Sequence, residues 1–224
     1  MGKLGEIGRV ILDWLYPPKC MYCGRILKDE DKAMMTCGEC YRSLELACNI
    51  RYLPDCICLS PFYYRGSVKS AIQKYKFHNL PLYSKGFAVP MAEAILKSRH
   101  YDFDIITWVP LSGKRLKSRG YDQARLLADE LSRELLIDCM PLLHKLLHNK
   151  SQTSTSAEAQ RRENVKGAYG IINTQDAAGK RILLVDDVCT TGSTLSECVG
   201  VLLEHGAQSI TCLTIAQTTI ADST

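Results

Sequence analysis

The chain has 224 residues, enough for one catalytic-sized domain with a small appendage and for a well-buried core. Hydrophobic residues make up 46% and charged residues 23%, which argues against disorder and coiled repeats and favours an ordinary soluble fold. No window carries the ~18 consecutive apolar residues of a spanning helix, and the N-terminus lacks the pattern of a signal peptide. We therefore expect a cytoplasmic protein without a membrane span.

The net charge of +4 is spread unevenly along the chain. Residues 61–120 hold 11 basic and 3 acidic side chains, whereas residues 181–224 hold 1 basic and 5 acidic ones. A basic segment beside an acidic one is typical of a polyanionic ligand held near carboxylates. A solvated basic face would give the same pattern.

The first predicted element is a short amphipathic helix over residues 4–15, which ends before Tyr16-Pro17-Pro18. Its apolar side chains fall on one stripe, and its polar side has no basic cluster. The stripe is therefore interpreted as a packing face rather than a membrane anchor.

Residues 19–58 contain seven of the 11 cysteines. An odd number of cysteines without export signals argues against a disulfide framework. Two CxxC pairs stand 13 residues apart, and they are formed by Cys20, Cys23, Cys37 and Cys40. Four thiolates close a tetrahedral site, so we predict one structural Zn²⁺, with an iron–sulfur cluster as the minor alternative. Cys48, Cys56 and Cys58 are interpreted as free thiols or as a degraded second pair.

From about residue 60 the pattern becomes an alternation of strands and helices. Strands are predicted at 61–66, 105–109, 137–143, 168–172, 182–185 and 209–216, and helices at 67–99 with a break at Pro81, 123–136 and 195–204. Near-continuous apolar strands between helices predict an open parallel α/β sheet covered on both faces. We therefore divide the chain into an amphipathic helix with a four-Cys zinc module, residues 1–59, and an α/β domain, residues 60–224.

The apolar strand at 182–185 leads into the segment with the clearest chemistry. Asp186 and Asp187 stand at its carboxyl end, where open α/β sheets bind ligands. The Thr-Thr-Gly-Ser-Thr loop at 190–194 then opens the next helix, and its hydroxyls and N–H groups suit a phosphate. Carboxylates repel phosphate, so they are predicted to hold ribose hydroxyls with Mg²⁺ nearby. A strand end capped by Asp and Thr is the plainer alternative.

This segment resembles the phosphoribosyl pyrophosphate (PRPP) signature of type I phosphoribosyltransferases, which is four apolar residues, an acidic pair and TTGxT. The resemblance implies that Asp186 and Asp187 bind the ribose. It also implies that the 5-phosphate is bound by Thr190, Thr191, Gly192, Ser193 and Thr194. The segment after the 105–109 strand corresponds to the pyrophosphate loop of that family, with candidates Leu111, Ser112, Gly113, Lys114, Arg115 and Arg119.

Two further stretches resemble the ComF-type competence proteins within that family. Val-Pro-Leu at 109–111 with Arg-Gly-Tyr-Asp-Gln-Ala at 119–124 looks like their VPL…RGxNQA stretch, and residues 161–169 resemble their RxxNVxGAF segment. A four-Cys module before the α/β domain is characteristic of the group. Asp122 stands where Asn is usual, and Tyr169 where Phe is usual. The resemblance implies a link to DNA uptake in natural transformation.

The polar stretch at 150–160 lacks apolar periodicity and is predicted to be a mobile loop. In the transferase family a flexible hood closes over PRPP at this position and excludes water. The resemblance makes Gln152, Arg161 and Arg162 candidates for contacts in that loop, although the two arginines would equally cap the following strand.

Two functions remain open from the sequence. The first is transfer of ribosyl phosphate from PRPP to an unknown acceptor, with pyrophosphate release; a glutamine amidotransferase is disfavoured, because Cys20 is better used as a metal ligand. The second is a non-catalytic competence protein that senses PRPP or phosphate and binds single-stranded DNA or a partner helicase. Aromatic and basic residues alternate over 63–77 as in a stacking groove, but an ordinary helix with one buried face gives the same spacing. The oligomeric state cannot be derived from the sequence.

Overall fold

The computed structural model describes residues 17–44, 46–98, 100–146 and 167–219. The predicted helix at 4–15 and the loop candidates Gln152, Arg161 and Arg162 lie outside the described residues. Within the described ranges, no helix has the length and apolar character needed to cross a bilayer.

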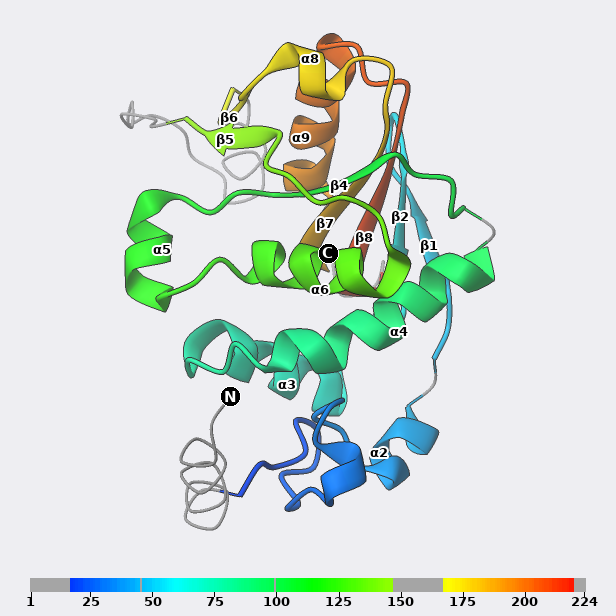
Figure 1. Ribbon diagram of the computed structural model, residues 1–224, viewed down its shortest axis with the longest axis vertical. Helices are drawn as coiled ribbons and strands as arrows, with labels where there is room; N and C mark the ends of the chain where they lie inside the picture. The colour runs from blue at the N-terminus through cyan, green and yellow to red at the C-terminus, as the bar shows by residue number, and fades with distance from the viewer. Residues whose placement is uncertain (1–16, 45, 99, 147–166, 220–224) are drawn as a thin grey trace, which may run out of the picture.

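A mixed, mostly parallel sheet forms the centre of the molecule, with strand order β1-β2-β8-β7-β4 (Figure 1). Its strands are β1 (Asn49–Tyr52), β2 (Ile57–Ser60), β4 (Ile105–Trp108), β7 (Arg181–Cys189), β8 (Ser209–Gln217) and the short β3 (Phe62–Tyr63) beside β8. Only β1 runs antiparallel to its neighbour. The predicted α/β fold and its strands at 105–109, 182–185 and 209–216 are confirmed.

The two faces of the sheet are covered by different helices. The helices are α2 (Gly38–Ser43), α3 (Gly66–Phe77), α4 (Tyr83–Ser98), α5 (Gly113–Arg119), α6 (Gln123–Leu135), α8 (Thr174–Ala177) and α9 (Ser193–Glu204), with a 3-10 turn, η1, at Asp29–Asp31. Leu183 and Val185 of β7 join the core that contains α3, α4 and α6. Ile182 and Leu184 point to the other side and pack with α9. Because alternate side chains of this strand are buried on both faces, its sequence is apolar throughout.

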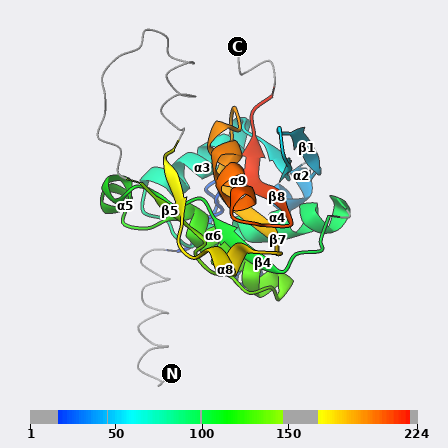
Figure 2. The same ribbon diagram turned by 90° about the horizontal axis from the view of Figure 1, so that it is seen from above.

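A second, two-stranded antiparallel sheet pairs β5 (Leu143–Lys145) with β6 (Tyr169–Ile171). Figure 2 shows this ribbon beside α9. The predicted strand at 137–143 is wrong over most of its length. Cys139 makes an isolated bridge to Ile106, and the N–H of Leu142 is bonded by the Thr107 hydroxyl instead of by a strand partner.

The metal module, defined here as residues 17–44, packs against α3 and α4 (Figure 1). Met21 is fully buried, and the Tyr22 ring meets the rings of Phe62 and Phe87 edge-on. Residues 49–60 form β1 and β2 of the central sheet, although most of them were assigned to the zinc module from the sequence. The division into two domains remains a proposal, and this pairing favours a boundary before Asn49.

Candidate functional site

A cavity of about 260 Å³ lies at the carboxyl ends of β4 and β7. It is lined by Tyr64, Lys76, Val109, Pro110, Leu111, Arg115, Arg119, Lys145, Tyr169, Asp186, Asp187, Val188, Thr190 and Thr194. The structure therefore brings together the acidic pair, both ends of the 190–194 loop and part of the 111–119 segment. Ser112, Gly113 and Lys114 do not line the cavity. Ser112 instead caps α5, where its hydroxyl accepts the N–H of Arg115 at 3.4 Å.

The 190–194 loop forms a separate hollow of about 40 Å³ that Asp186 and Val188 also line. Thr191 and Ser193 place their hydroxyl oxygens 2.9 Å apart in it. Gly192 has φ +81°, a left-handed conformation that L side chains rarely adopt, and it begins α9 as the N-cap. Hydroxyls and N–H groups at the start of a long helix make this hollow suitable for an anion.

The acidic pair lies at the inner wall of the cavity. Asp186 accepts the N–H of Asp187 at 2.8 Å, and burial, together with the charge of Asp187, raises the pKa of Asp186 to about 8. Asp187 forms an ion pair with Lys76 of α3, at 2.7 Å between Nζ and Oδ1. The two side chains are 18% and 14% exposed, so this pair is better shielded than the surface ion pairs. The site thus contains a carboxyl group for which ionisation is costly.

Asp122 connects the cavity wall to α6. One carboxylate oxygen accepts the N–H of Leu111 at 3.2 Å, and the other accepts the N–H of Arg125 at the same distance. Burial raises the pKa of the Asp122 carboxyl group. Arg119 is also held in place, because its guanidinium donates to Gln123 at 2.9 Å and lies 5.2 Å from the centre of the Phe77 ring.

The β5–β6 ribbon contributes Lys145 and Tyr169 to the lining of the cavity. Lys145 donates to the Tyr169 hydroxyl at 3.0 Å. Burial, with a contribution from the positive charge of Arg115, lowers the pKa of Lys145. Lys76, Arg115, Arg119 and Lys145 therefore line the cavity with four cationic side chains facing the acidic pair. Such a wall suits a ligand with several phosphate charges.

Three of the residues around the site were missed by the sequence reasoning. Lys76 was considered only as part of the alternating aromatic and basic pattern over 63–77, and Lys145 was not singled out. Arg51 of β1 donates to the carbonyl oxygens of Thr190 and Thr218, so it supports the 190–194 loop from behind. No local pattern marks these residues, because each belongs to an element distant in sequence from the acidic pair.

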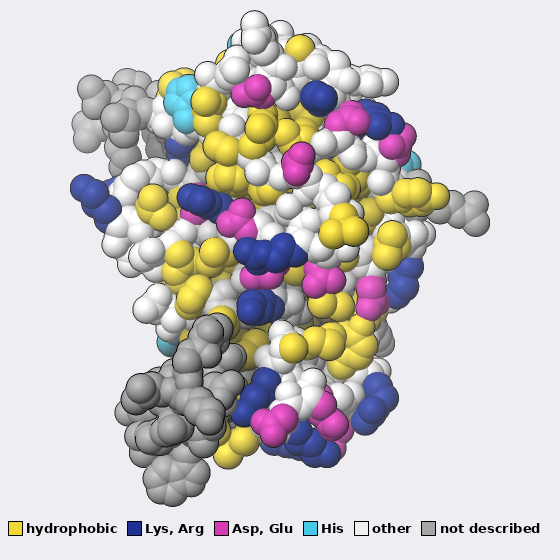
Figure 3. Space-filling view, viewed as in Figure 1, with side chains coloured by type: hydrophobic (Ala, Val, Ile, Leu, Met, Phe, Trp, Pro, Cys, Tyr) yellow, Lys and Arg dark blue, Asp and Glu magenta, His cyan; other side chains and the backbone are white. Residues whose placement is uncertain are grey.

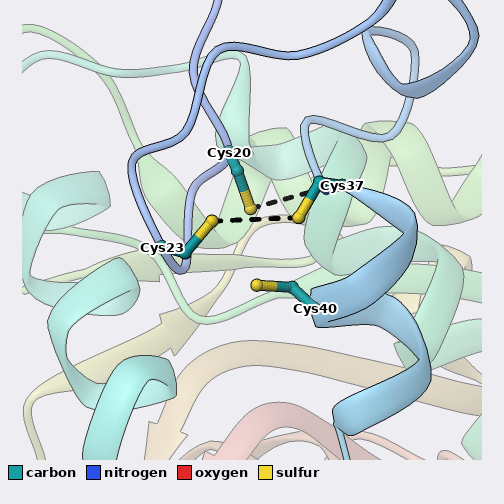
Figure 4. Close-up of side chains that lie close together, drawn as sticks. All are labelled: Cys20, Cys23, Cys37 and Cys40. Atoms are coloured by element: carbon teal, nitrogen blue, oxygen red, sulfur yellow. Dashed lines mark hydrogen bonds between the residues drawn. The ribbon is translucent and has the colours of Figure 1, made fainter.

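The four predicted metal ligands converge on one point (Figure 4). Their Sγ atoms all lie within 4.8 Å of one another. The sulfur atoms of Cys23 and Cys37 are 3.8 Å apart, which matches the edge of a tetrahedron with metal–sulfur bonds of ~2.3 Å. The backbone N–H of Cys37 donates to the Cys20 sulfur at 3.4 Å, a contact that stabilises a thiolate. The four-Cys group could hold a metal ion.

The aromatic and basic residues of 63–77 do not form one groove. The Tyr75 ring is fully buried in the core, and Lys76 belongs to the cavity. Cation–ring contacts remain at Arg65 over Tyr63 and at Lys69 over Tyr64. The interpretation as a helix with one buried face therefore accounts for part of this pattern.

Comparison with known proteins agrees with this arrangement. The phosphoribosyl transferase domain family matches residues 121–221. Competence protein F of Haemophilus influenzae is 30% identical over 193 residues, which are 80% of this chain and 83% of that protein. Competence protein ComFC of Streptococcus pneumoniae is 31% identical over 149 residues, 66% of this chain and 63% of that protein.

Among solved structures, glutamine PRPP amidotransferase from B. subtilis is 18% identical and gives a TM-score of 0.46, over 68% of this chain and 36% of that chain. The matched domain and the sheet order define an α/β protein of the phosphoribosyltransferase class. Within that class the chain belongs to the competence protein F family, the ComF/ComFC-type proteins, since it spans most of that relative at 30% identity.

Proposed function

We propose that the protein binds PRPP in the 260 Å³ cavity and transfers its ribosyl phosphate to an acceptor, with release of pyrophosphate. The observation that carries the proposal is that the acidic pair and four cationic side chains line one cavity. The smaller hollow of the 190–194 loop shares Asp186, Thr190 and Thr194 with that cavity. In this assignment Thr190 to Thr194 hold the 5-phosphate, and Asp186 and Asp187 accept hydrogen bonds from the ribose hydroxyls. Arg115 and Arg119 face the pyrophosphate.

The reaction then depends on positioning and electrostatics. As the bond from the ribosyl carbon to pyrophosphate breaks, positive charge develops on carbon and negative charge on the leaving oxygen. Arg115, Arg119 and Lys145 stabilise the leaving group. The carboxylates of Asp186 and Asp187 are oxygen ligands of the kind that Mg²⁺ takes, and Mg²⁺ bound with PRPP would neutralise further phosphate charge.

Lys76 takes part in the proposed binding of PRPP. Its ammonium group forms an ion pair with Asp187. Ribose hydroxyls that donate to Asp187 compete with this ion pair, and Lys76 can then turn to a phosphate oxygen, because it lines the same cavity. PRPP binding therefore exchanges one charge-assisted contact for another.

Titration calorimetry with PRPP and Mg²⁺ tests the proposal. Asp187→Asn and Thr191→Val should each lower PRPP affinity at least tenfold, since a charge-assisted hydrogen bond contributes ~1.5–3 kcal/mol. The matched control is Asp138→Asn, an exposed carboxylate outside the cavity, which should bind as the parent does. A pyrophosphate-release screen over nucleobases and amines then tests transfer. If both site variants bind PRPP like the parent and are equally stable, the proposal is wrong.

A second candidate function is binding of single-stranded DNA, and two exposed rings favour it. Tyr52 is 81% exposed, and Tyr63 carries the Arg65 guanidinium over its face. Aromatic rings beside cations bind bases by stacking and phosphates by charge. The face drawn in Figure 3 is a poor candidate, because basic and acidic side chains are interspersed on it.

The DNA hypothesis is tested by fluorescence anisotropy of a labelled oligonucleotide at several salt concentrations. Lys69 lies over the ring of Tyr64, the neighbour of Tyr63 in the chain. Lys69→Gln should weaken binding and reduce the salt dependence, because a lysine on phosphate releases counterions. Lys180→Gln is the matched control, since Lys180 is exposed at the opposite end of the strands. Equal affinity of parent and Lys69→Gln, or affinity that does not change with salt, argues against this surface.

The metal is also a proposal. We infer one structural Zn²⁺ on Cys20, Cys23, Cys37 and Cys40, because four converging thiolates leave no open coordination position for catalysis. When bound, the ion would supply folding free energy to a module with few buried side chains of its own.

A further inference from the structure

Four cysteines outside the metal module lie together behind the 190–194 loop. Cys58 of β2 and Cys212 of β8 are register partners on adjacent strands, and Cys189 ends β7 immediately before Thr190. These three thiols are at most 1% exposed. Cys56, in the turn between β1 and β2, completes the group and is partly exposed. None of the four lines the 260 Å³ cavity or belongs to the metal module, and Cys189 alone borders the hollow of the 190–194 loop.

Within this group, Cys56 and Cys212 are in contact. Their Sγ atoms are 3.6 Å apart. A hydrogen bond from Cys212 lowers the pKa of Cys56, and the same contact raises the pKa of Cys212. The more accessible sulfur is thus the one with more thiolate character, which is the property of a reactive cysteine.

We propose that Cys56 and Cys212 are a redox-active thiol pair that forms a reversible intramolecular disulfide. The oxidant is the disulfide of a small thiol, RSSR. The Cys56 thiolate attacks one sulfur of RSSR and releases RS⁻, which leaves a mixed disulfide on Cys56. Cys212, deprotonated by the released thiolate, attacks the Cys56 sulfur and expels the second RS group. Two protein thiols are oxidised, and one RSSR is reduced to two RSH.

The position of Cys56 allows the sulfurs to close from 3.6 Å to bonding distance, ~2.05 Å. Cys56 lies before the first residue of β2, so the movement falls on a turn and leaves the strand ladder in place. Cys58 and Cys189 are both buried on strands, which gives a bulky oxidant no access to them.

The disulfide would fix the turn that supports the 190–194 loop. The Leu53 N–H donates to the Cys56 carbonyl at 2.9 Å, which closes the turn. The Leu53 side chain packs on Gly192, and Arg51 of the preceding strand bonds Thr190. A bond from Cys56 to β8 therefore restrains the residues that contact the loop from behind.

The arrangement of these four thiols fits a disulfide better than a metal site. Among the described residues, only the four cysteines of the metal module form a group of three or more ligand atoms within 4.8 Å of one another. The Cys56 group lacks that convergence, whereas a disulfide needs only the one close pair that is present.

The test uses the full chain with its metal bound. The protein is incubated with oxidised glutathione, remaining thiols are alkylated, and tandem mass spectrometry maps the linkages. We expect a Cys56–Cys212 bond that dithiothreitol reverses, and slower hydrogen exchange over residues 51–58 in the oxidised protein. Cys212→Ser should stop at a glutathione adduct on Cys56, and Cys56→Ser should form no bond at Cys212. Cys139→Ser, a partly exposed thiol elsewhere, is the control and should behave as the parent.

Three results would overturn the proposal. In the first, Cys56 is still a free thiol after oxidation and becomes alkylated. In the second, Cys56 pairs with a cysteine other than Cys212, and in the third, the reduced parent holds a second metal ion that Cys56→Ser loses. The linkage map of the parent needs no variant, so the test stands even if a substitution at buried Cys212 prevents folding.

Discussion

Docking of the metal module on α4 predicts a measurable cost for one methyl group at Gly86. A Cβ at this position would lie 2.5 Å from the carbonyl oxygen of Met34 and 2.6 Å from the Met21 sulfur. The Met34 oxygen belongs to the backbone and cannot yield without moving the module. The Met21 side chain is flexible but fully buried, which leaves its sulfur little room to move. Overpacking of this kind costs ~1–3 kcal/mol.

The helix propensity of alanine offsets part of that cost, because Ala is favoured over Gly in a helix interior by ~0.5–1 kcal/mol. We therefore expect Gly86→Ala to lower the free energy of unfolding by about 1–2 kcal/mol. Gly200 in α9 is the matched control, since a Cβ there meets nothing within 4 Å. Gly200→Ala should raise stability by ~0.5–1 kcal/mol.

Thermal unfolding at a fixed zinc concentration separates the two variants. For a chain of this size 1 kcal/mol shifts the midpoint by ~2–4 °C, so the two substitutions should move it in opposite directions. A Gly86→Ala protein that gains as much stability as Gly200→Ala would show that the module does not press on α4, and the docking described above would be refuted.

Three further predictions concern the site and the metal. Gly192→Ala should lower PRPP affinity at least tenfold in calorimetry, because the loop must change its shape to accept a Cβ. At φ +81° alanine is strained by ~1–2 kcal/mol, and the new Cβ overlaps Leu53. Unchanged affinity would show that the 190–194 loop is not part of the binding site. Cys20→Ser should release about one zinc per chain by elemental analysis and lower the unfolding temperature, and a parent protein without metal would contradict the zinc assignment. Burial raises the pKa of Asp186 to about 8, so the folded state favours the neutral carboxyl group. The contribution of this group to the free energy of unfolding is therefore complete below pH ~4 and is lost as pH rises through about 8. In urea unfolding, the free energy of unfolding should therefore fall less between pH 5 and 9 for Asp186→Asn than for the parent. If the two proteins show the same change with pH, the raised pKa is contradicted.

The parts of the site that could be predicted depend on local patterns. Ile182 to Val185 are buried on both faces, which requires four consecutive apolar residues and identifies the strand. The acidic pair follows directly on the same strand, where the side chains from Asp186 to Val188 are only partly buried. The CxxC spacing likewise restricts four thiols to two tight turns, so their convergence could be read from the sequence.

The parts that could not be predicted depend on contacts between distant segments. β2 pairs with β8 about 150 residues later in the chain, and its four residues carry no alternation that marks a strand. Lys76 reaches Asp187 only because α3 packs beside the carboxyl end of β7. In the 111–119 segment, helix α5 begins at Gly113, so Ser112 serves as its cap. Arg115 and Arg119 of this helix line the cavity, whereas Lys114 does not.

Asp122 shows how a departure from the family pattern fits this chain. The ComF-type motif that this stretch resembles has Asn at this position, and an amide has one acceptor oxygen. The carboxylate of Asp122 accepts from Leu111 with one oxygen and from Arg125 with the other. The second acceptor joins the cavity wall to the first turn of α6 through a single side chain. The carboxylate of Asp122 also places a further negative charge near the acidic pair. The charge of Asp187 contributes to raising the pKa of Asp122, and the charge of Asp122 contributes to raising the pKa of Asp186. The cationic wall formed by Lys76, Arg115, Arg119 and Lys145 offsets this charge, so the same carboxylate that orders the cavity also increases its need for cations.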